Sequence, residues 1–300
     1  MSTHHDPSVL RRMLALRQFP LLAGIERADL AVFAENVIET TLPAGAVIAA
    51  ARSRLGALHF VLEGQIESAD MSWGPREVCG VIEVLARRSM SAPAIATTEV
   101  RTLQLSSGEL GEILEDNFGV MSSVVRELAG RALAIGLPRT RAPRPLVTAG
   151  PLGLVERLIV LRQQVPFARA GLQALATLAH DSEELILPPG ATLARTGEAA
   201  SRAFVVVEGT LHARQPNGMS SVHGIGDAIG LFETLASAPH GSTVEALTQV
   251  RALASTGAAL FDVLEDHGDV GLAMLATLAG AMLDAPAIQS AGSLPAAPSN

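Results

Sequence analysis

The sequence contains no lysine and no tyrosine, and it has one cysteine and one tryptophan. A single cysteine, Cys79, excludes an intrachain disulfide and a metal cage built from thiolates. Cys79 stands in an apolar run typical of a strand, so we expect a small buried side chain there. The net charge of −8 means that the chain lacks the basic surface by which proteins hold nucleic acids, and we expect no DNA binding.

The sequence also lacks a hydrophobic run long enough to cross a membrane. The longest candidate, Val270 to Leu283, has 14 residues, whereas a membrane-spanning helix needs about 20. The N-terminal stretch "MSTHHDPSVLRR" has no apolar core of a signal peptide. We therefore expect no membrane insertion and a cytoplasmic protein.

The chain does contain enough apolar sequence for folded domains, and this sequence is duplicated. Apolar residues make up 48% of the 300 residues, a length that suggests two domains. Related segments recur at an offset of 145 and, further along, of 150. They include "LPAG" (42–45) with "LPPG" (187–190), "HFVLEG" (59–64) with "FVVVEG" (204–209), and "GVIEVLA" (80–86) with "GLFETLA" (230–236). The second copy has five extra residues before this last segment, which predicts a longer hairpin.

The sequence of each copy predicts helices, then short strands separated by Gly/Pro turns, then helices. This order predicts an α+β protein of two tandem jelly-roll or β-roll domains, each flanked by N- and C-terminal helices. The alternation in "HFVLEGQIES" predicts that one strand face, with Phe60, Leu62 and Ile66, is buried and the other is exposed. The predicted divisions are a flexible N-terminus (1–14), domain 1 (15–137), a Pro/Gly-rich linker (138–153), domain 2 (154–284) and a disordered tail (285–300).

These segments resemble the cyclic-nucleotide-binding domain family over about residues 15–135 and 160–283. The resemblance rests on "FPLLAGIERADLAVFA", "LHFVLEGQI", "TEVRTLQLSSGELGEILEDN" and, in the second copy, "LPPGATLARTGEAASRAFVVVEGTL". It implies an eight-stranded β-roll, an N-terminal helical bundle, and a C-terminal helix that acts as a lid or a dimer contact. It also implies a ligand cassette of the form Gly-Glu-Leu-Ala followed by Pro-Arg-Ala-(Ala/Ser)-Thr. There the arginine and backbone N–H groups hold the cyclic phosphate, and the glutamate accepts from the ribose 2′-hydroxyl.

Both copies depart from this pattern at the two polar anchors. In the first, the glutamate position is Val81 and the arginine position is Met90; in the second they are Leu231 and His240. Losing both anchors costs about 3–6 kcal/mol, from charge-assisted hydrogen bonds of about 1.5–3 kcal/mol each. The cassette-equivalent residues are Gly80, Val81, Ile82, Glu83, Met90 and Ser91 in the degenerate first copy, and Gly230, Leu231, Phe232, Glu233, His240, Gly241, Ser242 and Thr243 in the second.

Several charged residues near the cassettes have two interpretations. Glu83 and Glu233 are shifted ribose acceptors or, as we favour, either members of a solvated face or N-terminal charges on a short helix turn. Arg87 and Arg88 are replacement phosphate cations or ordinary surface charges. His212 and His223 lie in the longer hairpin, but no third ligand follows at a regular spacing, so we expect no metal.

No catalytic motif is present, so we expect no enzyme and no catalytic residue. We expect no helix-turn-helix domain behind either copy. The layout is similar to the regulatory subunit of cAMP-dependent kinase, although no pseudosubstrate segment is visible. The stretch Val270–Leu283 is apolar all round, which indicates either that both its sides are covered, as in a dimer contact, or that it packs on its own β-roll and exposes alanine. The candidate partner-facing residues of this helix are Leu272, Leu275, Leu278, Ala279 and Met282.

The leading hypothesis is a non-enzymatic regulatory or scaffold protein that has mostly lost nucleotide binding, needs no cofactor, and acts through protein partners, as a homodimer. The alternative is a sensor in which domain 2 binds cAMP, another cyclic mono- or dinucleotide, or another anionic small molecule through backbone amides, His240, Ser242 and Thr243. A third interpretation is a metal-dependent or enzymatic jelly roll.

Overall fold

The computed structural model describes residues 7–135 and 150–285, apart from 23, 70, 165, 166 and 169. The chain divides into two compact units, one of Met1–Ile135 with Leu275–Asn300 and one of Gly136–Met274. This division differs from the expected boundary at 284, because the second half of the last helix groups with the first unit. The expected linker core, 136–149, and the tail from 286 onward lie outside the described residues.

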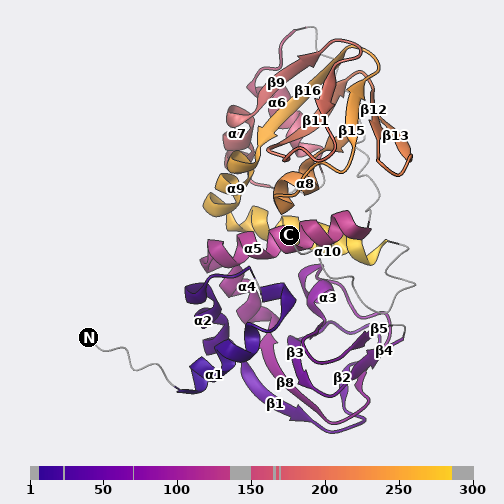
Figure 1. The fold of residues 1–300 in the computed structure, drawn as a ribbon. Coiled ribbons are helices and arrows are strands. Elements are labelled where there is room, and N and C mark those ends of the chain that lie inside the picture. Colours follow the sequence, from indigo (N-terminus) through magenta and orange to yellow (C-terminus); the bar gives the residue numbers. More distant parts are fainter. Residues whose placement is uncertain are drawn as a thin grey trace. The chain divides into compact units, whose positions relative to one another are not determined.

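The first unit is a β-roll with helices at both ends of its sequence (Figure 1). Its strands form two antiparallel sheets, in the orders β1-β8-β3-β6 and β2-β7-β4-β5. The helices are α1 (Pro7–Leu16), η1 (Pro20–Leu22), α2 (Arg27–Asn36), α3 (Val81–Leu85), α4 (Ser107–Asp116) and α5 (Phe118–Ile135). The strands are β1 (Ile38–Leu42), β2 (Val47–Ala49), β3 (Ala57–Glu63), β4 (Ile66–Ser68), β5 (Met71–Trp73), β6 (Val78–Cys79), β7 (Ala94–Ala96) and β8 (Val100–Ser106).

The second unit repeats this topology, with sheets in the orders β9-β16-β11-β14 and β10-β15-β12-β13. Its helices are α6 (Leu154–Arg162), α7 (Leu172–Asp181), α8 (Leu231–Ala236), α9 (Gly257–Asp266) and the first half of α10 (Gly268–Leu283). Its strands are β9 (Glu183–Leu187), β10 (Thr192–Ala194), β11 (Arg202–Glu208), β12 (Leu211–Arg214), β13 (Ser220–His223), β14 (Ala228–Ile229), β15 (Thr243–Ala246) and β16 (Val250–Thr256). The predicted fold of two tandem β-rolls with flanking helices is confirmed, and the five extra residues lie at the β12–β13 hairpin.

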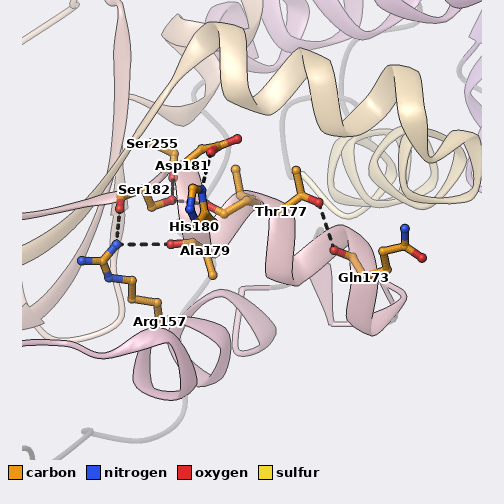
Figure 2. Close-up of polar contacts among 9 residues, drawn as sticks. Arg157, Gln173, Thr177, Ala179, His180, Asp181, Ser182 and Ser255 are labelled. Carbon is orange, nitrogen blue, oxygen red and sulfur yellow. Dashed lines mark hydrogen bonds and ion pairs between the residues drawn. The ribbon is translucent and has the colours of Figure 1, made fainter.

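The N-terminal helix corrects one predicted boundary. Residues 1–14 were expected to be flexible, but α1 begins at Pro7. Arg12 of this helix donates to the carbonyl oxygen of Val37 at 2.6 Å, just after α2. In the second unit Arg157 donates to the carbonyl oxygen of Ser182 at 2.5 Å, just after α7 (Figure 2). Both guanidinium groups satisfy carbonyls at a helix C-terminus, which otherwise lack an intrahelical donor.

The central strand β3 departs from the predicted half-buried pattern. Phe60 and Val61, which point to opposite faces, are both fully buried. Phe60 meets the ring of Phe19 edge-on at 5.1 Å between centroids, and Val61 belongs to the core of the roll. Glu63 and Glu67 on the expected outer face are exposed, as predicted, whereas Val61 is buried because it packs in the interior of the roll.

Candidate ligand cassettes

Each cassette begins at a glycine that turns a short strand into a short helix. Gly80 follows β6 with φ of 86°, and Gly230 follows β14 with φ of 73°. A larger residue at Gly80 is disfavoured by the positive φ, and its Cβ would lie 2.5 Å from Cδ1 of Leu55, so the Leu55 side chain would have to shift. A residue with positive φ follows each short helix: Arg87, two residues after α3, has φ of 55°, and Ser237, directly after α8, has φ of 54°. The two loops therefore share one backbone course.

The position of the family's arginine is equivalent in the two units. Met90 N–H donates to the Ser53 carbonyl oxygen, and the Met90 carbonyl oxygen accepts from Arg52 N–H, both at 2.9 Å. His240 makes the same pair of bonds with Glu198 and Gly197, at 2.8 and 2.9 Å. The backbone that would carry a phosphate-binding guanidinium is thus kept in both units, while the guanidinium is absent from both positions.

The interior of the first cassette is apolar and closely filled. Val81 and Ile82 are buried, and Met90 is only 1% exposed. Ser91, by contrast, is exposed. A methionine buried to this extent gives a phosphate neither charge nor a hydrogen-bond donor.

Glu83 corrects the interpretation of this residue as part of a solvated face. Its side chain is 5% exposed, and burial raises the pKa of Glu83, an effect partly opposed by a hydrogen bond from its own backbone N–H. Glu233, its counterpart, is half-buried. The two aligned glutamates therefore have different surroundings.

Sequence reasoning did not connect His59 with Cys79, which lies close to Glu83. His59 on β3 stands directly opposite Cys79 on β6. Both are buried, and His59 Nδ1 has no hydrogen-bond partner among the described residues. Burial lowers the pKa of His59 to about 4, and burial followed by the nearby Glu83 charge raises the pKa of the Cys79 thiol. At neutral pH His59 is uncharged and supplies no cation to the cassette.

In the second cassette the imidazole of His240 lies against Gly230. A Cβ on that glycine would come within 3.2 Å of His240 Cε1, and His240 is 9% exposed. The Thr243 hydroxyl is 3.1 Å from that of Thr196 and accepts from Thr196 N–H at 3.2 Å. Leu231, Phe232 and Ser242 are half-buried and Gly241 is exposed.

The structure decides between the two interpretations of Arg88. Its guanidinium donates to both carboxylate oxygens of Asp284, from Nη1 to Oδ1 at 2.5 Å and from Nη2 to Oδ2 at 2.9 Å. Arg87 is exposed. Sequence reasoning missed Asp284, since nothing local relates two residues that are 196 positions apart.

The two hairpin histidines do not converge on a metal. His223 pairs with Leu211 across the hairpin, and His212 pairs with Val222, so the histidine side chains point to opposite faces of the sheet. Among the described residues no group of three or more His, Cys, Asp or Glu could hold a metal ion.

The expectation that five residues of α10 face a partner needs correction. Leu275, Leu278, Ala279 and Met282 are buried within the chain itself, and Leu272 is half-buried. A partner could reach the four buried side chains only if the helix moved. No helix in the described ranges is long and apolar enough to span a bilayer.

Residues 184–267 match the family model described as the cyclic nucleotide-binding domain. The second unit contains a cyclic nucleotide-binding domain. A search of curated proteins returned no match. The match extends from β9 to the end of α9. It includes Leu231 and His240, which stand at the positions of the family's glutamate and arginine.

Solved structures similar to the chain include protein kinase A regulatory proteins and one domain of a transcriptional regulator. The regulatory domain of Toxoplasma gondii PKA with cAMP is 15% identical, with a TM-score of 0.36, and the match covers 89% of this chain and 95% of that one. The regulatory subunit of a cAMP-independent protein kinase A from Trypanosoma brucei is 16% identical, with a TM-score of 0.36 and coverages of 95% and 92%. The N-terminal domain of a transcriptional regulator from Streptomyces coelicolor is 29% identical, with a TM-score of 0.39 and coverages of 43% and 95%.

Proposed function

We propose that the protein is a non-enzymatic regulatory or scaffold protein whose two β-rolls have lost most of their affinity for cyclic nucleotides and which acts through contacts with proteins. The observation that carries this proposal is the shared backbone position of Met90 and His240. In both cassettes a buried side chain other than arginine takes the place from which a guanidinium would reach the phosphate. The glutamate position is apolar in both as well.

The remaining nearby cations do not compensate. Arg88 already holds a carboxylate, and the half-exposed position of that pair leaves it outside the buried interior of the cassette. Without the two anchors a cyclic nucleotide loses about 3–6 kcal/mol, which is roughly two to four decades in affinity. A ligand that would bind at micromolar concentration then binds too weakly to act as a signal.

Isothermal titration of the full chain with cAMP, cGMP and cyclic di-GMP, at pH 6 and pH 7.5, tests this proposal. We expect no binding tighter than about 100 μM, the range that the lost anchors predict. The matched variant Leu231→Glu/His240→Arg restores both anchors on the unchanged backbone and is expected to bind. Binding by the restored variant alone shows that the cassette is intact and has lost its ligand through these two residues.

The second candidate function is a sensor that binds an anionic ligand in the second unit. The observation that favours it is the imidazole of His240, which lies beside Gly230 at the start of α8. Binding tighter than about 100 μM at pH 6 that is lost in His240→Ala would establish the sensor and overturn the scaffold proposal.

Exposed apolar residues on equivalent helices support action through protein contacts. Leu10 and Leu14 on α1 are exposed, and so are Val155 and Ile159 at the same positions of α6. Both are i,i+4 pairs and share one face of their helix. We propose that these two exposed faces, one on α1 and one on α6, make the contact between two copies of the chain. The protein is then a cytoplasmic homodimer that binds no DNA.

Light scattering coupled to size-exclusion chromatography tests the dimer. The wild type is expected to have twice the mass of one chain. The mass of a single chain is expected for each of two double variants, Val155→Glu/Ile159→Glu and Leu10→Glu/Leu14→Glu. Leu172→Glu, an equally exposed apolar position on α7, is the control and should leave the dimer intact. A wild type of single-chain mass would refute the homodimer.

A further inference from the structure

The pair Arg88–Asp284 joins the loop after α3 to the end of the last helix. Asp284 directly follows α10, in the part of the chain that groups with the first unit. The two guanidinium nitrogens and the two carboxylate oxygens form a bidentate pair, at 2.5 and 2.9 Å. Two parallel charge-assisted bonds fix orientation as well as distance.

The fold itself does not require this pair. The counterpart of Arg88 in the second unit is Ala238. The N–H of Arg88 donates to the Glu83 carbonyl oxygen, and the N–H of Ala238 donates to the Glu233 carbonyl oxygen, both at 2.9 Å. The counterpart of Asp284 in the first unit is Ala134, near the end of α5. Both partners are thus alanine in the other copy, although the backbone is alike. The pair is therefore an addition to the common β-roll.

Electrostatics at the helix end explains why a cation is needed there. The C-terminus of a helix carries partial negative charge, and a carboxylate next to it adds repulsion. Asp284 N–H still donates to the Gly280 carbonyl oxygen at 3.1 Å, so its side chain stands at this end. Arg88 Nη2 lies against the helix at Gly280, where a Cβ would be 3.7 Å away. One guanidinium neutralises both the carboxylate and the helix end.

Both partners are charged at neutral pH but remain open to solvent. The hydrogen bond with Asp284 raises the pKa of Arg88, and the hydrogen bond with Arg88 lowers the pKa of Asp284. Their side chains are 47% and 63% exposed, so water and salt compete with the pair. Next to it on α10 lie the buried apolar residues Leu278 and Met282.

We propose that the Arg88–Asp284 ion pair holds the C-terminal end of α10 on the first unit and thereby controls the exposure of Leu278 and Met282. With the pair formed, these side chains are covered. With the pair broken, the last turn of the helix opens more often. This inference is independent of whether either cassette binds a nucleotide.

Hydrogen exchange of the full chain, followed by mass spectrometry, tests the inference. Arg88→Ala and Asp284→Asn are each expected to raise the exchange rates of amides 279–285 by roughly two- to fivefold, the range of an exposed ion pair. Arg87→Ala removes a neighbouring exposed arginine and is the matched control, with no change expected. High salt should raise the same rates in the wild type and not in Arg88→Ala.

The reversed pair Arg88→Asp/Asp284→Arg separates pairing from other effects of the single changes. Restoration of slow exchange towards the wild-type rate, relative to Arg88→Asp alone, supports the inference. It is overturned if Arg88→Ala exchanges as Arg87→Ala does, or if the effects of Arg88→Ala and Asp284→Asn add fully in the double variant. Additive effects would mean that the two residues act separately.

Discussion

Met90 and His240 occupy the same backbone position in the two units: the N–H and the carbonyl of each bond to the loop that follows the second strand of its β-roll. Only the side chains differ, and one is fully buried while the other is at the edge of burial. The loss of the family's anchors is therefore a change of side chains on a conserved loop course. This makes single substitutions at the two positions informative.

The first prediction concerns packing under Met90. Met90→Ala removes a side chain that is 1% exposed, and such changes cost about 2–5 kcal/mol because a cavity remains. His240→Ala, at the equivalent and less buried position, should cost less. Urea unfolding of both variants measures the difference. Equal midpoints for Met90→Ala and the wild type would contradict the description of the first cassette as closely filled.

The second prediction concerns the pH dependence of stability from His59. Burial lowers the pKa of His59 from 6.5 to about 4, so between these values the unfolded chain binds a proton that the folded chain does not. The free energy of unfolding should then fall as the pH falls through this window. The slope is about 1.4 kcal/mol per pH unit, or about 3 kcal/mol in all.

His59→Phe provides the control for this pH dependence, because Phe204 holds the same position in the second unit. Denaturant unfolding from pH 7 to pH 4 should show a shallower loss of stability in the variant than in the wild type. Parallel curves for the two proteins would show that His59 does not change its protonation on unfolding in this range.

The third prediction concerns a glycine at a strand turn. Gly209 has φ of 87°, and a Cβ there would lie 2.2 Å from the Gln249 carbonyl oxygen. Gly218 has φ of 84° but open space around it. Gly218→Ala should cost about 1 kcal/mol from backbone conformation alone, and Gly209→Ala considerably more because the backbone must shift. Thermal unfolding compares them, and equal losses would refute the close approach.

The fourth prediction concerns Arg157, whose guanidinium joins the start of the second unit to the end of α7. It donates to the carbonyl oxygens of Ala179 at 3.3 Å and Ser182 at 2.5 Å (Figure 2). It also donates to the Leu152 carbonyl oxygen at 3.0 Å. Arg157→Ala should destabilise the unit by about 2–3 kcal/mol, because these carbonyls lose a charged donor. Arg162→Ala, at the exposed end of the same helix, is the control. A similar small effect of both changes on the urea midpoint would contradict this role.

The sequence by itself determined the duplication, the order of elements and the positions at which the cassettes depart from their family. These features are local: a glycine that must adopt positive φ, a Pro-x-Gly turn or an alternating strand leaves a pattern within a few residues. The breaks between α4 and α5 and between α9 and α10 occur at Asn117 and His267, close to the glycines at 119 and 268.

Only the tertiary structure decided which side chains are buried and which distant residues meet. Glu83 looks like a surface residue in the sequence, and its burial depends on strands and loops folded around α3. The apolar face of α10 suggested a partner, yet the chain covers four of its five candidate residues itself. The Arg88–Asp284 pair joins two residues that are far apart in the sequence, so it forms only once the chain has folded. Burial and long-range electrostatics depend on neighbours in three dimensions and not on sequence spacing.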